Sequence, residues 1–137
     1  MKTVTIRWQR LTDVNGQTCA RCMSTQNSIQ SAYRKLKESF SVLDIEVILQ
    51  KENIDFPIFS KDPLQSNRIW VNEKPLEQWI GATVGQSKCC DVCGESECRT
   101  VTIGQDTFEI IPEDMIIQAA FLAAADILKK NPIINKS

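Results

Sequence analysis

The sequence predicts an α/β fold, in which a central mixed sheet is flanked by helices. Polar and apolar residues alternate over 1–8 and again over 44–51, which is the period of a half-buried strand. Between these two segments the apolar residues recur at helical spacing. A strand–helix–strand order favours a parallel pair of strands joined by a right-handed crossover.

Length and composition limit the organisation and the partners. The chain has 137 residues, of which 42% are hydrophobic and 24% are charged, with a net charge of −1. This length predicts a single domain spanning 1–137. The basic residues are spread along the chain, so we expect neither a nucleic acid nor an anionic membrane as partner.

The first expected strand has Val4, Ile6 and Trp8 on one face. Arg7 interrupts the apolar stretch that a signal peptide would need. We therefore expect a cytoplasmic protein. In that reducing compartment its cysteines should not form a structural disulfide framework.

The helix expected after the first strand carries an apolar stripe made of Ile29, Tyr33, Leu36 and Phe40. A loop over 10–18, with a turn signal at Asn15 and Gly16, precedes it. Continued backwards, the stripe meets Cys22 and Cys19. The pattern therefore predicts that these two cysteines lie at the first turn of the helix.

The middle of the chain predicts shorter elements. Residues 53–65 are expected to be irregular, and 67–76 to form a strand, a tight turn and the start of a return strand. A cysteine-rich insertion is expected at about 82–100. Residues 100–110 indicate a further short strand pair around Gly104.

The last expected helix runs from Pro112 to about Lys130. Between Met115 and Leu128 only Gln118 and Asp126 are polar. The helix is too short to span a membrane, which needs about 20 apolar residues. Burial against the sheet is the favoured interpretation. The alternative is that its second face buries a partner subunit, giving a homodimer.

The cysteines indicate what the chemistry is. The chain has six cysteines and no histidine. Two form a CxxC, Cys19 to Cys22, and the other four fall within ten residues, at Cys89, Cys90, Cys93 and Cys98. Outside a secreted disulfide scaffold, such grouping indicates thiol–disulfide exchange or thiolate–metal binding.

The CxxC suits redox chemistry. A thiolate at a helix N-terminus is stabilised by free backbone N–H groups and by the positive end of the helix dipole, and Arg21 adds a cation. Cys19, nearer the helix tip, is the expected nucleophile, and Cys22 is the resolving thiol. Metal ligation, or a pair of incidental buried thiols, remain the alternatives for this motif.

The second cysteine group suits metal binding or a second redox centre. Cys90 to Cys93 is a CxxC followed by Gly94, the form of a metal knuckle, and Cys98 adds a third thiolate. Cys89 or a nearby carboxylate could complete a zinc site.

Four other interpretations of this group stay open. Cys90 and Cys93 could join the first CxxC in one four-thiolate site for zinc or an iron–sulfur cluster. The loop could act as a second dithiol in a relay. The vicinal pair Cys89–Cys90 could bind soft thiophilic ions, or a metal could merely tie down a long loop.

The order of a strand, a CxxC opening a helix, a second strand and a later hairpin is similar to the thioredoxin and glutaredoxin arrangement. The resemblance implies a thioredoxin-like fold with a cysteine-rich insertion. It also implies a disulfide or thiol partner, either a protein or a small molecule. Where thioredoxins carry a cis-proline facing the active site, this chain has Ser66 and Asn67, which the resemblance places in a substrate-facing loop.

The whole pattern also resembles a family of small uncharacterised bacterial and archaeal proteins with a thioredoxin-like fold. The matching segments are Thr18 to Cys22, Ser66 to Ile69, Lys74 to Glu77, the four-cysteine loop ending at Cys98 to Thr100, and Ile111 to Glu113. This resemblance implies a fold more than an activity.

Overall fold

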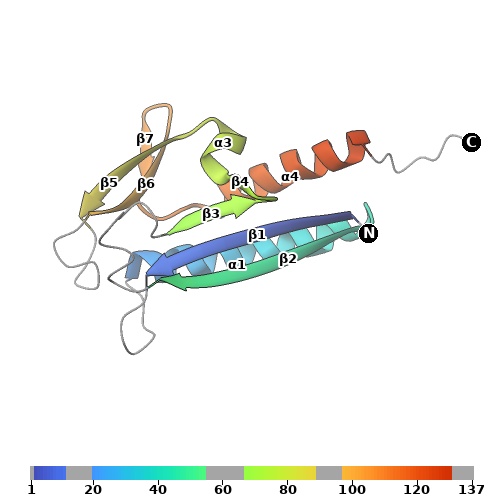
Figure 1. The fold of residues 1–137 in the computed structure, drawn as a ribbon, viewed down its shortest axis with the longest axis horizontal. Helices are drawn as coiled ribbons and strands as arrows, with labels where there is room; N and C mark the ends of the chain where they lie inside the picture. Colours follow the sequence, from blue (N-terminus) through green and yellow to red (C-terminus); the bar gives the residue numbers. More distant parts are fainter. Residues whose placement is uncertain (1, 12–19, 55–66, 89–96, 131–137) are drawn as a thin grey trace, which may run out of the picture.

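The computed structural model describes residues 2–11, 20–54, 67–88 and 97–130. Strand β1 (Lys2–Leu11), helix α1 (Ala20–Ser41) and strand β2 (Ile45–Ile54) form the first unit. The two strands pair in parallel, as expected from the strand–helix–strand order. Figure 1 shows both strands running alongside α1.

Strands β1 and β2 are longer than the sequence predicts. The sequence predicts a loop at residues 10 and 11 and an irregular segment at residues 53 and 54. Both predictions are wrong at these positions. The parallel ladder runs from Lys2 opposite Ile45 to Leu11 opposite Ile54 without a break. Continuous backbone pairing therefore extends both strands beyond the residues that alternate in polarity.

A hairpin completes the first sheet. Strand β3 (Arg68–Val71) pairs antiparallel with β1, and the two-residue strand β4 (Lys74–Pro75) pairs antiparallel with β3, giving the order β2-β1-β3-β4. Asn72 and Glu73 form the tight turn, with φ of 49° and 66°. Both positive angles match a type I′ turn, whose twist suits a hairpin.

A second sheet lies in the region expected to be a cysteine-rich loop. Strands β5 (Thr83–Lys88), β6 (Glu97–Ile103) and β7 (Asp106–Phe108) pair antiparallel in that order. The expected strand pair around Gly104 is confirmed. The loop prediction is wrong over 83–88 and over 97–99, because these residues pair with one another as strands β5 and β6.

Two more helices follow. Helix α3 (Leu76–Ile80) begins where the return strand was expected to continue, and it ends at Gly81, whose φ is 70°. Helix α4 (Glu113–Lys130) confirms the expected last helix. No described helix is long and apolar enough to cross a membrane.

One apolar core joins these elements. The predicted stripe of α1 is buried at Ile29, Leu36 and Phe40, and α1 packs against α4 and β2. Trp8 from β1 and Val101 from β6 belong to the same buried cluster. The partly buried Tyr33 packs at its border. The core therefore holds α1 against the first sheet.

Candidate functional site

In the sequence, the first CxxC overlaps the start of helix α1. The helix begins at Ala20, directly after Cys19, so the backbone of Cys22 lies in its first turn. Cys19 and the side chains of Arg21 and Cys22 lie outside the described residues. The first N–H groups of any α-helix lack an intrahelical partner, and the helix dipole adds a partial positive charge there. This end of α1 therefore favours a negatively charged group.

A buried polar cluster lies just behind this helix start. It consists of the side chains of Thr25, Asn67 and Trp8 and the backbone N–H of Ile111. Thr25 Oγ1 accepts hydrogen bonds from Asn67 Nδ2 at 3.1 Å and from Ile111 N at 3.3 Å. Asn67 Oδ1 accepts one from Trp8 Nε1 at 3.0 Å. Each of the three side chains is at most 1% exposed.

The polar cluster links segments that are far apart in the chain. Thr25 lies three residues after Cys22, about one turn along α1. Asn67 directly precedes β3, and Ile111 comes shortly before α4. Because buried polar groups without partners are costly, this set of bonds fixes the first turns of α1 against both segments.

Asn67 was expected in a substrate-facing loop together with Ser66. Ser66 lies outside the described residues. The Asn67 backbone adopts the left-handed conformation, with φ of 57°, which Asn tolerates better than most residues. Its side chain is turned inward to Thr25 and Trp8. Asn67 therefore positions its neighbours through a buried side chain.

Arg10 connects the surface of α1 to the end of the sheet. Its Nε donates to Asn53 Oδ1 and its guanidinium also donates to Gln26 Oε1, both at 2.8 Å. The guanidinium lies 5.4 Å from the centre of the Trp8 ring. The sequence does not single out Arg10, because its partners come from β2 and α1.

The other face of the first sheet carries Trp70, which is 9% exposed. The guanidinium groups of Arg7 and Arg68 lie 3.9 Å and 4.6 Å from the centre of its ring. Arg7 also pairs with Glu52 at 2.9 Å. Trp70 is thus largely covered by cations, which favours a packing role over an exposed binding platform.

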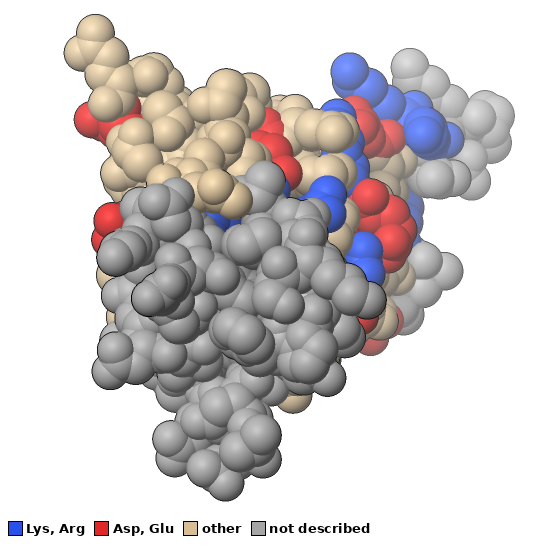
Figure 2. All heavy atoms as spheres, turned by 60° about the vertical axis from the view of Figure 1, so that its left-hand side comes forward, with Lys and Arg blue, Asp and Glu red and all other residues tan. Residues whose placement is uncertain are grey.

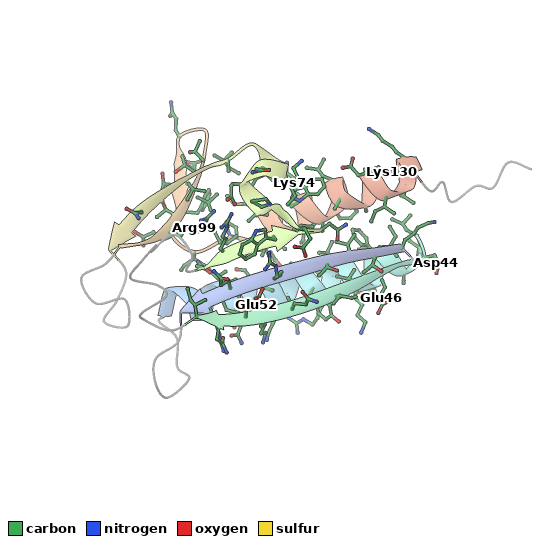
Figure 3. The ribbon with its side chains drawn as sticks, viewed as in Figure 1. Asp44, Glu46, Glu52, Lys74, Arg99 and Lys130 are labelled. Atoms are coloured by element: carbon green, nitrogen blue, oxygen red, sulfur yellow. The ribbon has the colours of Figure 1, made fainter. Side chains whose placement is uncertain are left out.

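A buried ion pair lies beside the second cysteine group. Arg99 of β6, labelled in Figure 3, pairs with Glu77 of α3, and the two side chains are only 5% and 14% exposed. The sequence does not single out this pair, because its two residues lie 22 positions apart in different elements. The pair fixes β6 at the residue after Cys98.

Strand pairing brings together the described residues that flank the segment 89–96. Lys88 pairs with Glu97, and Ser87 pairs with Cys98. Cys89, Cys90 and Cys93 belong to residues 89–96, which lie outside the described residues, as does the side chain of Cys98. Within the described ranges no three metal-binding side chains gather.

The described residues that border both cysteine groups lie toward one end of the molecule. In Figure 1 the start of α1, the ends of β1 and β2, the start of β3 and the paired ends of β5 and β6 all lie toward the left of the long axis. Figure 2 brings this side forward, and basic and acidic residues are interspersed over its described surface.

An ion pair joins the two long helices, α1 and α4. Lys35 Nζ lies 2.9 Å from Glu113 Oε1. The hydrogen bond from Ser31 lowers the pKa of Glu113 from its usual value, and the hydrogen bond from Lys35 adds a smaller effect in the same direction. The contact holds the start of α4 against α1.

The described residues define a mixed α/β protein with two sheets and a polar cluster behind the start of α1. The chain belongs to the family described as a domain of unknown function, DUF2703, whose model matches residues 4–120. It is 42% identical over 113 residues to an uncharacterized protein of Archaeoglobus fulgidus, covering 82% of each chain. No solved structure matches the sequence significantly. The expectation of a small uncharacterised family is thereby confirmed, and the family's description names neither a fold nor an activity.

Proposed function

We propose that the protein is a thiol–disulfide oxidoreductase with a thioredoxin-like fold, in which Cys19 and Cys22 exchange with a substrate disulfide. The observation that carries the proposal is the start of α1 at Ala20, within a parallel β1–α1–β2 unit. In the sequence, the two cysteines bracket this helix start.

The sheet supports the proposed fold. A parallel crossover pair is followed by an antiparallel hairpin, in the order β2-β1-β3-β4, and a long helix ends the unit. This agrees with the order of elements on which the resemblance to thioredoxin and glutaredoxin rests. The three-stranded second sheet would then be the insertion that carries the other cysteines.

The electrostatics of a helix start support the choice of nucleophile. Free N–H groups and the dipole stabilise a thiolate more than a thiol, and the Arg21 cation would act in the same direction. Such environments lower a cysteine pKa from about 8.5 to about 7 or below. The thiolate is the attacking species in disulfide exchange, so this environment would favour attack by Cys19.

The proposed reaction has two exchange steps. The Cys19 thiolate attacks one sulfur of the substrate disulfide, forming a mixed disulfide and releasing one substrate thiolate. Cys22 loses its proton to solvent, and its sulfur attacks the sulfur of Cys19, releasing the second thiolate. Two electrons pass from the protein dithiol to the substrate, and an external dithiol restores the reduced protein.

The polar cluster would position the resolving thiol. Thr25 is about one turn beyond Cys22 and is held by two hydrogen bonds from outside α1. Because this fixes the first turns of the helix, the exchange would need little rearrangement of the backbone. We place the reaction in the cytoplasm, with a protein or small-molecule disulfide as substrate.

Three cysteine substitutions test the proposal. Reduction of insulin by dithiothreitol is measured with the wild type, Cys19→Ser and Cys93→Ser. We expect Cys19→Ser to abolish catalysis and Cys93→Ser to retain it. Cys22→Ser should accumulate the mixed disulfide with substrate, which mass spectrometry detects. Full catalysis by Cys19→Ser would contradict the assignment of the nucleophile.

The β5–β6 pairing favours a second candidate function, thiolate metal binding. Because Lys88 pairs with Glu97, the segment that holds Cys89, Cys90 and Cys93 starts and ends at adjacent strand positions. A short connection between paired strands limits how far its residues can separate. Thiolates so confined suit zinc or an iron–sulfur cluster.

Elemental analysis of protein purified without oxygen tests this candidate. If the loop holds a metal, Cys93→Ser loses it and has a lower melting temperature, while Cys19→Ser keeps its metal content. A coloured wild-type sample would indicate an iron–sulfur cluster. Metal-free wild-type protein, purified in the presence of zinc and iron, would contradict this second function and leave the first intact.

A further inference from the structure

Helix α4 presents an exposed face of mixed character. Its buried face includes Ile116, Ala119 and Ala123, which pack into the core. The residues of the opposite face form what we call the α4 stripe: Asp114, Gln118, Phe121, Leu122, Ala125 and Lys129. Their spacing keeps them within about 100° of the helix circumference. Phe121 and Leu122 remain 47% and 40% exposed, although both are large and apolar.

The α4 stripe is symmetric about its own centre. Helix α4 runs from Glu113 to Lys130, so Phe121 and Leu122 occupy its middle. If a second copy of the helix lies antiparallel across this point, Phe121 of each copy faces Leu122 of the other. The same operation places Gln118 opposite the small Ala125 and Asp114 opposite Lys129.

The charges of α4 favour this antiparallel arrangement over a parallel one. Its first turn carries Glu113 and Asp114, and its last turn carries Lys129 and Lys130. Antiparallel copies bring acidic ends to basic ends, and the helix dipoles also attract in this orientation. Parallel copies would bring like charges together, which opposes association.

Contacts within one copy hold Phe121, in the middle of the α4 stripe, in place before association. The Phe121 ring meets the Phe40 ring edge-on, with centres 5.1 Å apart and an interplanar angle of 89°. Phe40 is fully buried, so it restricts the movement of Phe121. A side chain already held in place loses little conformational entropy on association.

We propose that two copies of this chain associate antiparallel through the α4 stripe, about a twofold axis between Phe121 and Leu122. An 18-residue helix is about 27 Å long. A single helix pair of this length buries less area than the roughly 1,200–2,000 Å² of standard stable interfaces. The dimer therefore dissociates on dilution.

Sedimentation velocity over a range of concentrations tests this proposal. The wild type should shift from the mass of one chain toward that of two as its concentration rises. Leu122→Glu should raise the Kd roughly a hundredfold, because it replaces an apolar contact twice in the symmetric interface. Val42→Glu is the matched control: Val42 is 81% exposed outside α4, and its change should leave the Kd unaltered.

A charge exchange tests the antiparallel register. Asp114→Lys and Lys129→Glu should each raise the Kd about tenfold, since each creates two like-charge contacts. The double variant should restore the wild-type Kd. A wild type that stays monomeric, a dimer insensitive to Leu122→Glu, or a double variant without rescue would each overturn the proposal. None of these measurements depends on the cysteine chemistry.

Discussion

At the scale of single residues, Thr25 supports more of the site than its size suggests. Its hydroxyl oxygen is the acceptor for both Asn67 Nδ2 and the Ile111 N–H. Neither donor can reach water, because Thr25, Asn67 and Ile111 are all buried. One oxygen atom thus satisfies two buried donors from two separate segments.

Thr25→Val keeps the shape of this side chain and removes the acceptor. We expect the free energy of unfolding to fall by about 1–3 kcal/mol, the cost of leaving buried donors unsatisfied. Urea denaturation followed by circular dichroism measures the change. Thr107→Val removes an exposed hydroxyl that bonds only Thr102 within the described residues, and should cost less than about 0.5 kcal/mol. Equal stability of the two variants would contradict the role given to Thr25.

At the scale of elements, the contact between α1 and α4 should respond to pH. The pKa of Glu113 is lowered by hydrogen bonds from Ser31 and Lys35. Its carboxylate therefore stabilises the folded state at pH values above 4.5, the ordinary pKa of this group. This stabilisation is lost as the pH falls through the lowered pKa.

The Glu113→Gln variant should lose less stability than the wild type when the pH falls below about 4.5. Melting temperatures recorded as a function of pH measure this. Glu38→Gln removes another exposed carboxylate, from α1, and controls for the change in net charge. The prediction fails if wild type and Glu113→Gln lose stability in parallel down to the lowest pH tested.

The elements with strong periodicity could be predicted from the sequence. Apolar residues recur at the helical period in α1 and alternate with polar residues in β1 and β2. The burial of Ile29 and Val47 follows this pattern. Strand β5 could not be predicted, because its residues Thr83–Lys88 show no apolar alternation and depend on pairing with β6. Helix α3 has only five residues, too few for a helical period to appear.

The candidate site was predictable only in part. The CxxC is visible in the sequence because its two cysteines are close together. The polar cluster is not, since Thr25 and Asn67 are 42 positions apart and neither is an unusual residue type. Asn67 was singled out through a resemblance, and its inward orientation depends on tertiary contacts that no local pattern encodes.

At the scale of the whole molecule, the Arg99–Glu77 pair joins the second sheet to the rest of the fold. Glu77→Gln removes the negative charge of this buried pair, so it should destabilise the protein by about 1.5–3 kcal/mol, the range for a hydrogen bond to a charged group. Glu52→Gln breaks the more exposed pair with Arg7 and should cost at most about 1 kcal/mol. Chemical denaturation of both variants provides the comparison. Similar losses for the two would contradict a special role for the buried pair.

The proposed dimer is compatible with the proposed chemistry. Helix α4 ends at the opposite end of the long axis from the paired ends of β5 and β6 (Figure 1). Lys130, labelled in Figure 3, marks that opposite end. Association through α4 would therefore leave open the end that carries the start of α1 and the paired ends of β5 and β6.

The hydrogen bond from Trp8 to Asn67 makes Trp8 an intrinsic fluorescent probe of the nearby turns of α1. The indole is fully buried and is connected through Asn67 to the second turn of α1. Trp8 should emit at the blue side of the tryptophan range, and its quantum yield should follow any movement of that turn. In the proposed exchange, oxidation of the two cysteines would then change the contribution of Trp8 to the intrinsic fluorescence, which the three tryptophans of the chain share.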